Sequence, residues 1–191
     1  MSDSTWFVLF GIDAGMTHFI NSFGGQNGFA DAILKLVSFV GIPAMVLAVA
    51  WQWWSRDQHP KKRYVLFSAG FSFLLALALN QIILLAVHRV RPYDAGVTHL
   101  LIAPSGDPSF PSDHASAAFA IAFAFLLRSR TKQGFVFAVC ASLVALSRVY
   151  VGTHYVGDVT GGALTACIAA LAVCLAYREY GRINQRLVSV L

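Results

Sequence analysis

Long apolar stretches without a charged side chain recur along the chain. Residues 64–87 form one such stretch of 24 residues, and residues 36–54 and 159–177 form two more of 19 residues each. A hydrocarbon core of about 30 Å is crossed by about 20 helical residues, so each stretch is long enough to span a bilayer. Pro43 lies inside the 36–54 stretch, and three tryptophans close it, as is typical of a membrane interface. The pattern predicts three transmembrane helices.

Two shorter apolar stretches, 115–127 and 134–147, become long enough to span if polar residues at one end, 112–114 and 148–150, belong to the helices. The segment up to about residue 24 is apolar but is interrupted by Asp13, His18 and Asn21, which favours an interfacial amphipathic helix over a sixth span. We therefore expect an all-α, polytopic transmembrane bundle of five or six membrane helices. It forms one domain over residues 1–191, without internal repeats.

Composition excludes an ordinary soluble domain, because 57% of the residues are hydrophobic and 12% are charged, against about 25% charged in soluble proteins. The net charge of +5 would fit a nucleic-acid partner, but the positions of the basic residues indicate a membrane topology instead. With five spans, ten of the fourteen basic residues share one side: Arg56, Lys61, Lys62, Arg63, Arg128, Arg130, Lys132, Arg178, Arg182 and Arg186. The positive-inside rule places that side in the cytoplasm and places segments 88–113 and 148–158 outside.

The outer segments contain a group of polar residues that is unusual in so apolar a chain. They are His88, Arg89, Arg91, Ser112, Asp113, His114, Arg148, His154 and Asp158. Each has an ordinary alternative role: an arginine can anchor at the interface, a serine can cap a helix, and a His–Asp pair four residues apart can be a surface hydrogen bond. Together, three guanidinium groups favour an anion with several oxygens, because each can donate two parallel hydrogen bonds to phosphate.

Histidines beside such an anion site have two distinct chemical uses. A neutral imidazole oriented by a carboxylate is a good nucleophile, and Asp158 follows His154 by four residues, so the two would share a face if a helix begins by residue 154. His114 is the candidate general acid for the departing oxygen. No HExxH motif or dense carboxylate cluster is present, so we expect no metal and no cofactor. The pattern favours metal-free phosphoryl transfer.

Three motifs of the chain carry a family resemblance. They are Arg91-Pro92, Pro111-Ser112-Asp113-His114, and Ser147-Arg148 followed by His154 and Asp158. Their order and spacing over residues 91–158 resemble the three-part signature of the type 2 phosphatidic acid phosphatase superfamily. The resemblance implies that His154 forms a phosphohistidine, that Asp158 orients it and that His114 protonates the leaving lipid phosphate. It also implies that Arg91, Ser112 and Arg148 bind the phosphate oxygens.

The chain departs from the family pattern at two positions. Leu84 stands where the first motif usually has lysine, and Asp113 stands where the second usually has glycine. The sequence SFPSDHA resembles the bacitracin-resistance branch, the bacterial undecaprenyl diphosphate phosphatases of the cell membrane, whose members also tend to lack the lysine. Arg89, His88 or Asp113 are further candidates at the phosphate, although Arg89 fits a solvated loop charge equally well and Asp113 fits a helix cap.

The resemblance implies a polyprenyl diphosphate as the lipid substrate, left after extracytoplasmic polymer assembly in cell-wall biogenesis. The expected active site therefore faces outward from the bacterial inner membrane. Phosphatidylglycerol phosphate or phosphatidate is the alternative substrate. A non-enzymatic transporter is disfavoured because mid-span polar groups are few, and Asn80 and Gln81 fit interhelical hydrogen bonding better than a conduction path. The sequence leaves the oligomeric state and the route of lipid entry open.

Overall fold

The computed structural model describes residues 3–54, 60–178 and 181, and throughout that part the regular structure is helical. The elements are α1 (Asp3–Asn21), α2 (Gly28–Trp51), the 3-10 helix η1 (Gln52–Trp54), α3 (Pro60–Leu84), α4 (Asp113–Leu127), α5 (Thr131–Tyr150) and α6 (Val156–Ala176). Four stretches in this part, in α2 with η1, α3, α5 and α6, are long and apolar enough to cross a membrane, and α4 is a shorter apolar helix. The predicted all-α membrane bundle is confirmed.

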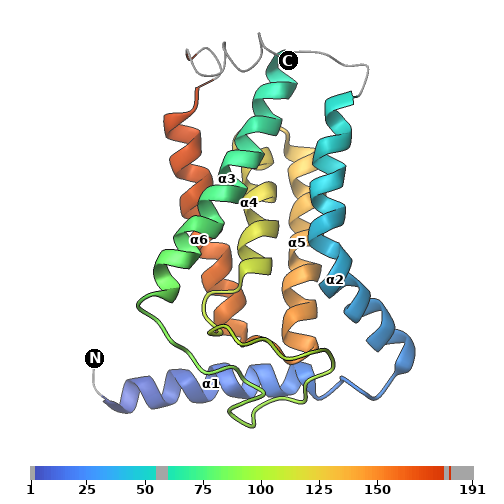
Figure 1. Cartoon of the computed structure of the whole chain (residues 1–191), viewed down its shortest axis with the longest axis vertical. Coiled ribbons are helices and arrows are strands. Elements are labelled where there is room, and N and C mark those ends of the chain that lie inside the picture. The colour runs from blue at the N-terminus through green and yellow to red at the C-terminus, as the bar shows by residue number, and fades with distance from the viewer. Residues whose placement is uncertain (1–2, 55–59, 179–180, 182–191) are drawn as a thin grey trace.

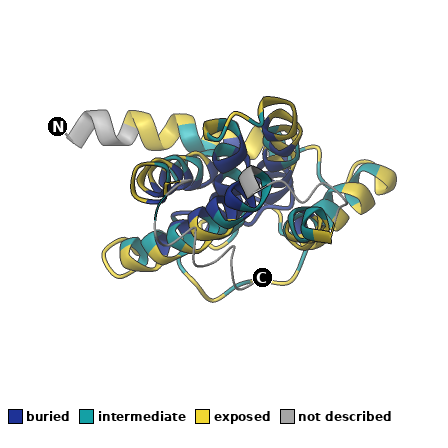
Figure 2. Cartoon of the chain, turned by 90° about the horizontal axis from the view of Figure 1, so that it is seen from above, coloured by how far each residue is buried: buried dark blue, intermediate teal, exposed yellow. Residues whose placement is uncertain are grey.

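Helix α4 occupies the centre of the bundle and packs against α3, α5 and α6 (Figure 1). Alanines line its buried sides, among them Ala115, Ala118 and Ala122. Small side chains let helix backbones approach closely in a membrane. At Gly162 of α6, an added Cβ would lie 2.7 Å from the backbone oxygen of Ser112. Figure 2 shows the result, with buried residues in the middle and exposed ones on the outer helix faces.

Helix α2 begins eight residues earlier than the apolar pattern predicts and packs chiefly against α5. Asn27 caps it, because its side chain accepts hydrogen bonds from the backbone N–H groups of Phe29 and Ala30. The charged residues in the added turns are accommodated, since Asp31 accepts a hydrogen bond from the Tyr150 hydroxyl at 2.8 Å. Helix α2 therefore extends beyond the charge-free stretch 36–54, and the predicted span lies within it and η1.

Helix α3 ends at Leu84, three residues before the predicted limit of the span. The chain turns there, because the backbone N–H groups of Ala86 and Val87 both donate to the carbonyl of Ile83. From this turn, residues 85–112 run across the end of the bundle as an irregular connection (Figure 1).

Helix α1 lies across the same end of the bundle, at a steep angle to the other helices (Figure 1). It is absent from the spans found among the described residues, and one side of it exposes large apolar side chains, including Leu9, Ile12, Met16 and Phe19. An exposed apolar face on a helix lying across a bundle end is typical of an interfacial helix. This placement agrees with the predicted interfacial position.

Asn21 fixes the end of α1 to two distant segments. Its side chain donates to the carbonyls of His99 at 2.9 Å and Tyr150 at 2.8 Å, and it accepts from the His99 N–H at 2.7 Å. Gly152 makes this approach possible, because its φ of +84° and the nearby His99 carbonyl exclude a side chain. One buried amide therefore joins α1, the 85–112 connection and the end of α5.

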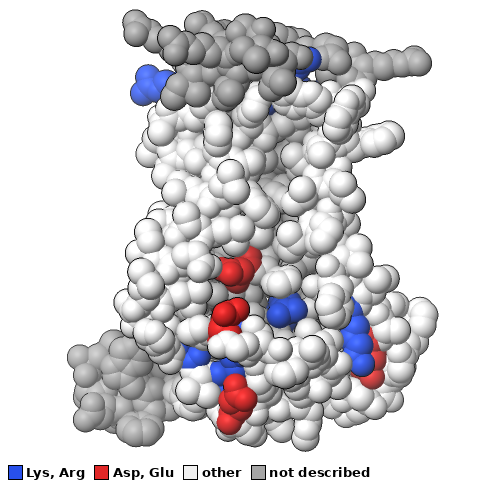
Figure 3. Space-filling view, in the orientation of Figure 1, with Lys and Arg blue, Asp and Glu red and all other residues white. Residues whose placement is uncertain are grey.

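The two ends of the bundle carry different charges. The described members of the predicted basic group lie at the end opposite α1, where α3 and α5 begin and α4 and α6 end: Lys62, Arg63, Arg128, Arg130, Lys132 and Arg178. Arg56, Arg182 and Arg186 lie outside the described residues, as does the side chain of Lys61. In Figure 3 the visible acidic side chains all lie toward the α1 end, with a charge-free band beyond them.

Replacing Asn21 with Leu is expected to lower the free energy of unfolding by about 1 to 3 kcal/mol, because the His99 N–H and the two carbonyls lose their buried partner. Thermal unfolding in detergent measures the change. Ser22→Ala is the matched control, since the Ser22 hydroxyl makes only an exposed local bond to Phe19. Equal effects of the two substitutions would contradict the anchoring role of Asn21.

Candidate active site

A cavity of about 480 Å³ lies at the end of the bundle where α3 and α5 end and α4 and α6 begin. Its wall comes from the end of α3, the 85–112 connection, the start of α4, the end of α5 and the α5–α6 connection. The lining residues are Gln81, Leu84, Leu85, His88, Arg91, Ser105, Asp107, Pro108, Pro111, Asp113, His114, Arg148 and His154. Two histidines and two arginines from the three sequence motifs therefore meet in one place.

The hydrogen bonds of His154 determine which ring nitrogen is free to react. Its Nδ1 lies 2.9 Å from the Ser109 carbonyl oxygen and 3.5 Å from Asp158 Oδ2. A carbonyl accepts hydrogen bonds and cannot donate one, so Nδ1 carries the hydrogen of the neutral ring. The other nitrogen, Nε2, then carries the lone pair, and it lies 3.5 Å from Arg91 Nη1. This tautomer is the one that a histidine nucleophile needs.

Asp158 is fully buried behind His154 and is surrounded by donors. Its Oδ2 accepts from the Ser109 hydroxyl at 2.5 Å and from the Tyr155 N–H at 2.8 Å, and its Oδ1 accepts from Arg89 Nη1 at 2.8 Å. Because α6 begins at Val156, His154 precedes the helix, and a shared helical face does not explain the pair. The hydrogen bond from the N–H of Tyr155, next to His154 in the chain, to Asp158 Oδ2 brings them together instead.

Burial lowers the pKa of His154 below the usual value for histidine. The nearby positive charges of Arg148 and Arg91 act in the same direction, whereas the hydrogen bond that His154 donates to Asp158 opposes them. Both burial and positive neighbours disfavour the imidazolium. His154 is therefore neutral over a wider pH range than a free histidine.

Arg91 and Arg148 are both buried, and their hydrogen bonds go to neutral acceptors. Arg91 donates to the carbonyls of Asp107 at 2.7 Å and Thr153 at 3.0 Å. Arg148 Nη1 donates to the Ser38 hydroxyl at 2.6 Å, and its Nε has no partner among the described residues. Buried guanidinium groups that are not neutralised by carboxylates favour binding of an anion.

Asp113 lines the cavity beside His114 and is tied to α3. Its Oδ1 accepts from Asn80 Nδ2 at 2.7 Å, and Asn80 also donates to the Ser116 hydroxyl at 2.8 Å. Asn80 thus forms the interhelical hydrogen bonds predicted for it. Ser112 stands at the N-cap of α4, but its side chain makes no capping bond.

The structure places six of the nine predicted site residues on the cavity wall: Arg91, His114, Arg148, His154, His88 and Asp113. Asp158 lies behind His154. Ser112 is fully buried and is absent from the wall, and its hydroxyl has no partner in the described ranges. Leu84 lines the cavity, and of the two candidates to replace the family lysine, His88 lines it and Arg89 does not.

Arg89 points toward Asp158, behind the cavity wall, and joins Asp158 to Asp13 of α1. Its second nitrogen, Nη2, pairs with Asp13 Oδ2 at 2.5 Å, and its guanidinium lies 3.8 Å from the centre of the Tyr155 ring. The other oxygen of Asp13 accepts from the Gly157 N–H at 2.7 Å. The sequence motifs do not include Asp13, whose only signal is a carboxylate within an apolar amphipathic segment.

Ser38 and Ser109 were also missed by the motif analysis. Ser38 lies in an apolar membrane helix, 110 residues from Arg148, and Ser109 precedes the Pro111–His114 motif. Ser38 has no distinguishing sequence signal, whereas Ser109 is the first residue of the SFPSDHA segment, in which no role was predicted for it. Within the described residues, no three His, Cys, Asp or Glu side chains are grouped so as to hold a metal ion.

Known proteins resemble this chain in sequence. Undecaprenyl-diphosphatase BcrC of Bacillus subtilis is 34% identical over 149 residues, which cover 78% of this chain and 76% of the relative. Putative undecaprenyl-diphosphatase YbjG of Escherichia coli is 28% identical over 159 residues, which cover 83% of this chain and 78% of the relative.

A solved structure shares the fold. It is the transmembrane PAP2 type phosphatidylglycerolphosphate phosphatase of Bacillus subtilis, with a TM-score of 0.61 and 21% identity, covering 92% of this chain and 89% of that one. The family model of the PAP2 superfamily matches residues 65–182, which include all three motifs. This match, the 34% identical relative and the shared fold lead to one assignment: the chain is a multi-pass membrane phosphatase that belongs to the PAP2 superfamily.

Proposed function

We propose that the protein hydrolyses undecaprenyl diphosphate to undecaprenyl phosphate and inorganic phosphate, on the extracytoplasmic side of the bacterial cell membrane. The main support for this proposal is that the Ser109 carbonyl fixes His154 in its Nδ1–H tautomer. His154 lines a cavity that is also lined by His114, Arg91 and Arg148. The relatives named undecaprenyl-diphosphatase support this lipid. The basic residues at the end opposite the cavity support the outward orientation.

In the proposed first step, Nε2 of His154 attacks the terminal phosphorus of the lipid diphosphate. The bond between that phosphorus and the bridging oxygen breaks, and protonated His114 gives its proton to the oxygen that leaves with undecaprenyl phosphate. Arg91 and Arg148 neutralise the charge on the transferring phosphoryl group. The Asp158 carboxylate stabilises the positive charge that develops on His154 and fixes the orientation of the imidazole ring.

In the proposed second step, a water molecule attacks the phosphorus of phosphohistidine-154. His114, now neutral, accepts a proton from that water, and the phosphorus–nitrogen bond breaks to release inorganic phosphate and neutral His154. The cycle needs no metal. Ser112 enters this scheme as a phosphate contact through the family resemblance alone, because its side chain does not reach the cavity wall.

Substitution of His154 with Ala is expected to lower kcat for phosphate release from undecaprenyl diphosphate by at least about a thousandfold, because the nucleophile is removed. The assay uses purified protein in detergent with a chelator present. His99→Ala is the matched control, since the exposed His99 is not part of the cavity wall. Full activity of the His154 variant would refute the mechanism, and inhibition of the wild type by the chelator would indicate a metal site.

The same assay decides the substrate. We expect kcat/KM for undecaprenyl diphosphate to exceed the values for phosphatidylglycerol phosphate and phosphatidate, presented at equal mole fraction in the same micelles. A glycerophospholipid monophosphate that is used equally well or better would replace the lipid diphosphate as the proposed substrate.

We expect kcat/KM to fall on the acid side only below about pH 6.5, the ordinary pKa of histidine. The sign follows from His154: its pKa is lowered by burial, so the neutral nucleophile persists to lower pH before it is protonated. Phosphorus NMR of the micellar substrate gives the substrate's own titration as the control. An acid limb above pH 6.5 that the substrate does not explain would contradict this prediction.

The Asp13–Arg89–Asp158 connection is expected to support turnover. Asp13→Asn and Arg89→Gln should lower kcat about tenfold with little change in KM, because Asp158 and the start of α6 lose their charged support. Arg89→Lys should keep more activity than Arg89→Gln. The control is Asp94→Asn, because Asp94 is an exposed carboxylate in the same 85–112 segment as Arg89. A raised KM with unchanged kcat would show that Arg89 acts on substrate binding instead.

A further inference from the structure

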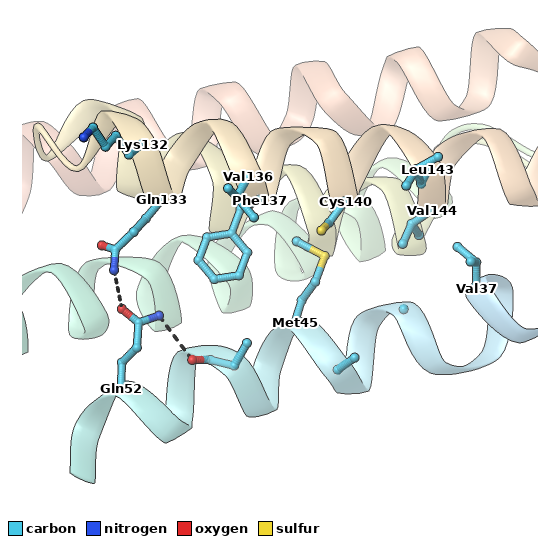
Figure 4. A pocket seen from close by; sticks show the side chains of 13 residues that line it. Val37, Met45, Gln52, Lys132, Gln133, Val136, Phe137, Cys140, Leu143 and Val144 are labelled. Carbon is cyan, nitrogen blue, oxygen red and sulfur yellow. Dashed lines mark hydrogen bonds between the residues drawn. The ribbon is translucent and has the colours of Figure 1, made fainter. Parts of the chain in front are cut away.

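An apolar groove lies between α2 and α5, on the outside of the bundle and apart from the phosphatase cavity. Its volume is about 570 Å³. Figure 4 shows Met45, Phe137 and Cys140 pointing into the space between the two helices. Val37 and Val144 lie toward one end of the groove, and Gln52, Gln133 and Lys132 lie at the other.

The groove is shaped by small residues on α2. At Gly41 an added Cβ would lie 2.5 Å from Val144 Cγ2, so the helices touch closely there. Ala44 and Ala48, further along α2, also line the groove, and their small side chains leave space between the helices. From residue 37 to residue 52 a helix rises about 22 Å, which exceeds half of a hydrocarbon core of about 30 Å. The groove is therefore long enough to hold one acyl chain of one leaflet.

A second, polar cavity adjoins the groove at its basic end. It measures about 380 Å³ and is lined by Ser129, Arg130, Thr131, Lys132 and Gln133. Lys132 and Gln133 line both spaces. Among the residues that the structure describes, neither space is lined by a carboxylate. Two basic side chains and two hydroxyls therefore stand where an acyl chain lying in the groove would carry its head group.

We propose that this combined site binds an anionic glycerophospholipid from the leaflet at the basic end of the bundle. Arg130 and Lys132 hold the head-group phosphate, and one acyl chain lies along the groove between α2 and α5. Basic cavities between membrane helices are suited to anionic head groups, and an ammonium or guanidinium group makes charge-assisted hydrogen bonds to phosphate. The site is independent of the proposed reaction, because the reaction cavity lies at the opposite end of α5.

The groove lies between two hydrogen-bonded connections of the α2 and α5 region. The lipid would contact α2 and α5, and the other end of the same helix pair carries the hydrogen bond between Arg148 and Ser38. Gln52 and Gln133 join the two helices at the basic end through a bond of 3.2 Å. An acyl chain in the groove would fill the space between these two connections.

The test is native mass spectrometry of the full chain, released from nanodiscs that contain equal amounts of phosphatidylglycerol and phosphatidylcholine. We expect phosphatidylglycerol to be retained preferentially. The double substitution Arg130→Gln with Lys132→Gln should lower the ratio of retained phosphatidylglycerol to phosphatidylcholine about tenfold. Ala48→Trp, which fills the groove, should reduce retention of both lipids.

Two control variants match these changes. Arg178→Gln removes an exposed basic residue at the same end, and Ala172→Trp adds bulk to an exposed position on α6. Both should retain phosphatidylglycerol like the wild type. Equal retention of the two lipids by the wild type, or unchanged selectivity in the Arg130/Lys132 variant, would overturn the proposal. The measurement does not use catalysis, so its outcome is separate from that of the phosphatase assay.

Discussion

The arrangement of the active-site end depends on the hydrogen bonds and the ion pair made by the buried carboxylate of Asp158. A buried charge is tolerated only when it is paired and hydrogen-bonded. Its partners come from segments far apart in sequence: Arg89 and Ser109 from the 85–112 connection and the Tyr155 N–H from the start of α6. Satisfying this one group therefore folds the connection onto the bundle, and the Ser109 carbonyl that results fixes the tautomer of His154.

Arginine has two different uses at this end of the molecule. Arg89 is neutralised by Asp13 and Asp158, so its charge holds structure together. Arg91 and Arg148 donate to carbonyl and hydroxyl acceptors, which satisfy hydrogen bonds without cancelling charge. The positive charge that remains in the cavity is available to phosphate. The distinction lies in the acceptor type, which the one-dimensional pattern of arginines does not contain.

The helical part of the fold was predictable because the membrane limits the solutions. Backbone groups in hydrocarbon must be paired within the segment, so long apolar stretches become helices. The differences from the sequence pattern lie at helix boundaries. The charge-free stretch begins at residue 36, whereas Asn27 caps α2 and the helix begins at Gly28. Helix α3 stops at Leu84, where the chain turns toward Arg89. Apolar content sets the length that fits the bilayer, whereas local hydrogen bonds set where a helix begins and ends.

By itself, the sequence determined the membrane bundle, the basic end and the motif residues, because hydrophobic length, charge position and residue type are properties of the chain alone. Tertiary structure decided which of these residues work together. Ser38 meets Arg148 across 110 positions and Asp13 meets Arg89 across 76. It also buried Ser112 and turned Arg89 away from the cavity. The reason is physical: hydrogen-bond partners of a buried charge are chosen by proximity in space, and that proximity exists only once the helices have packed.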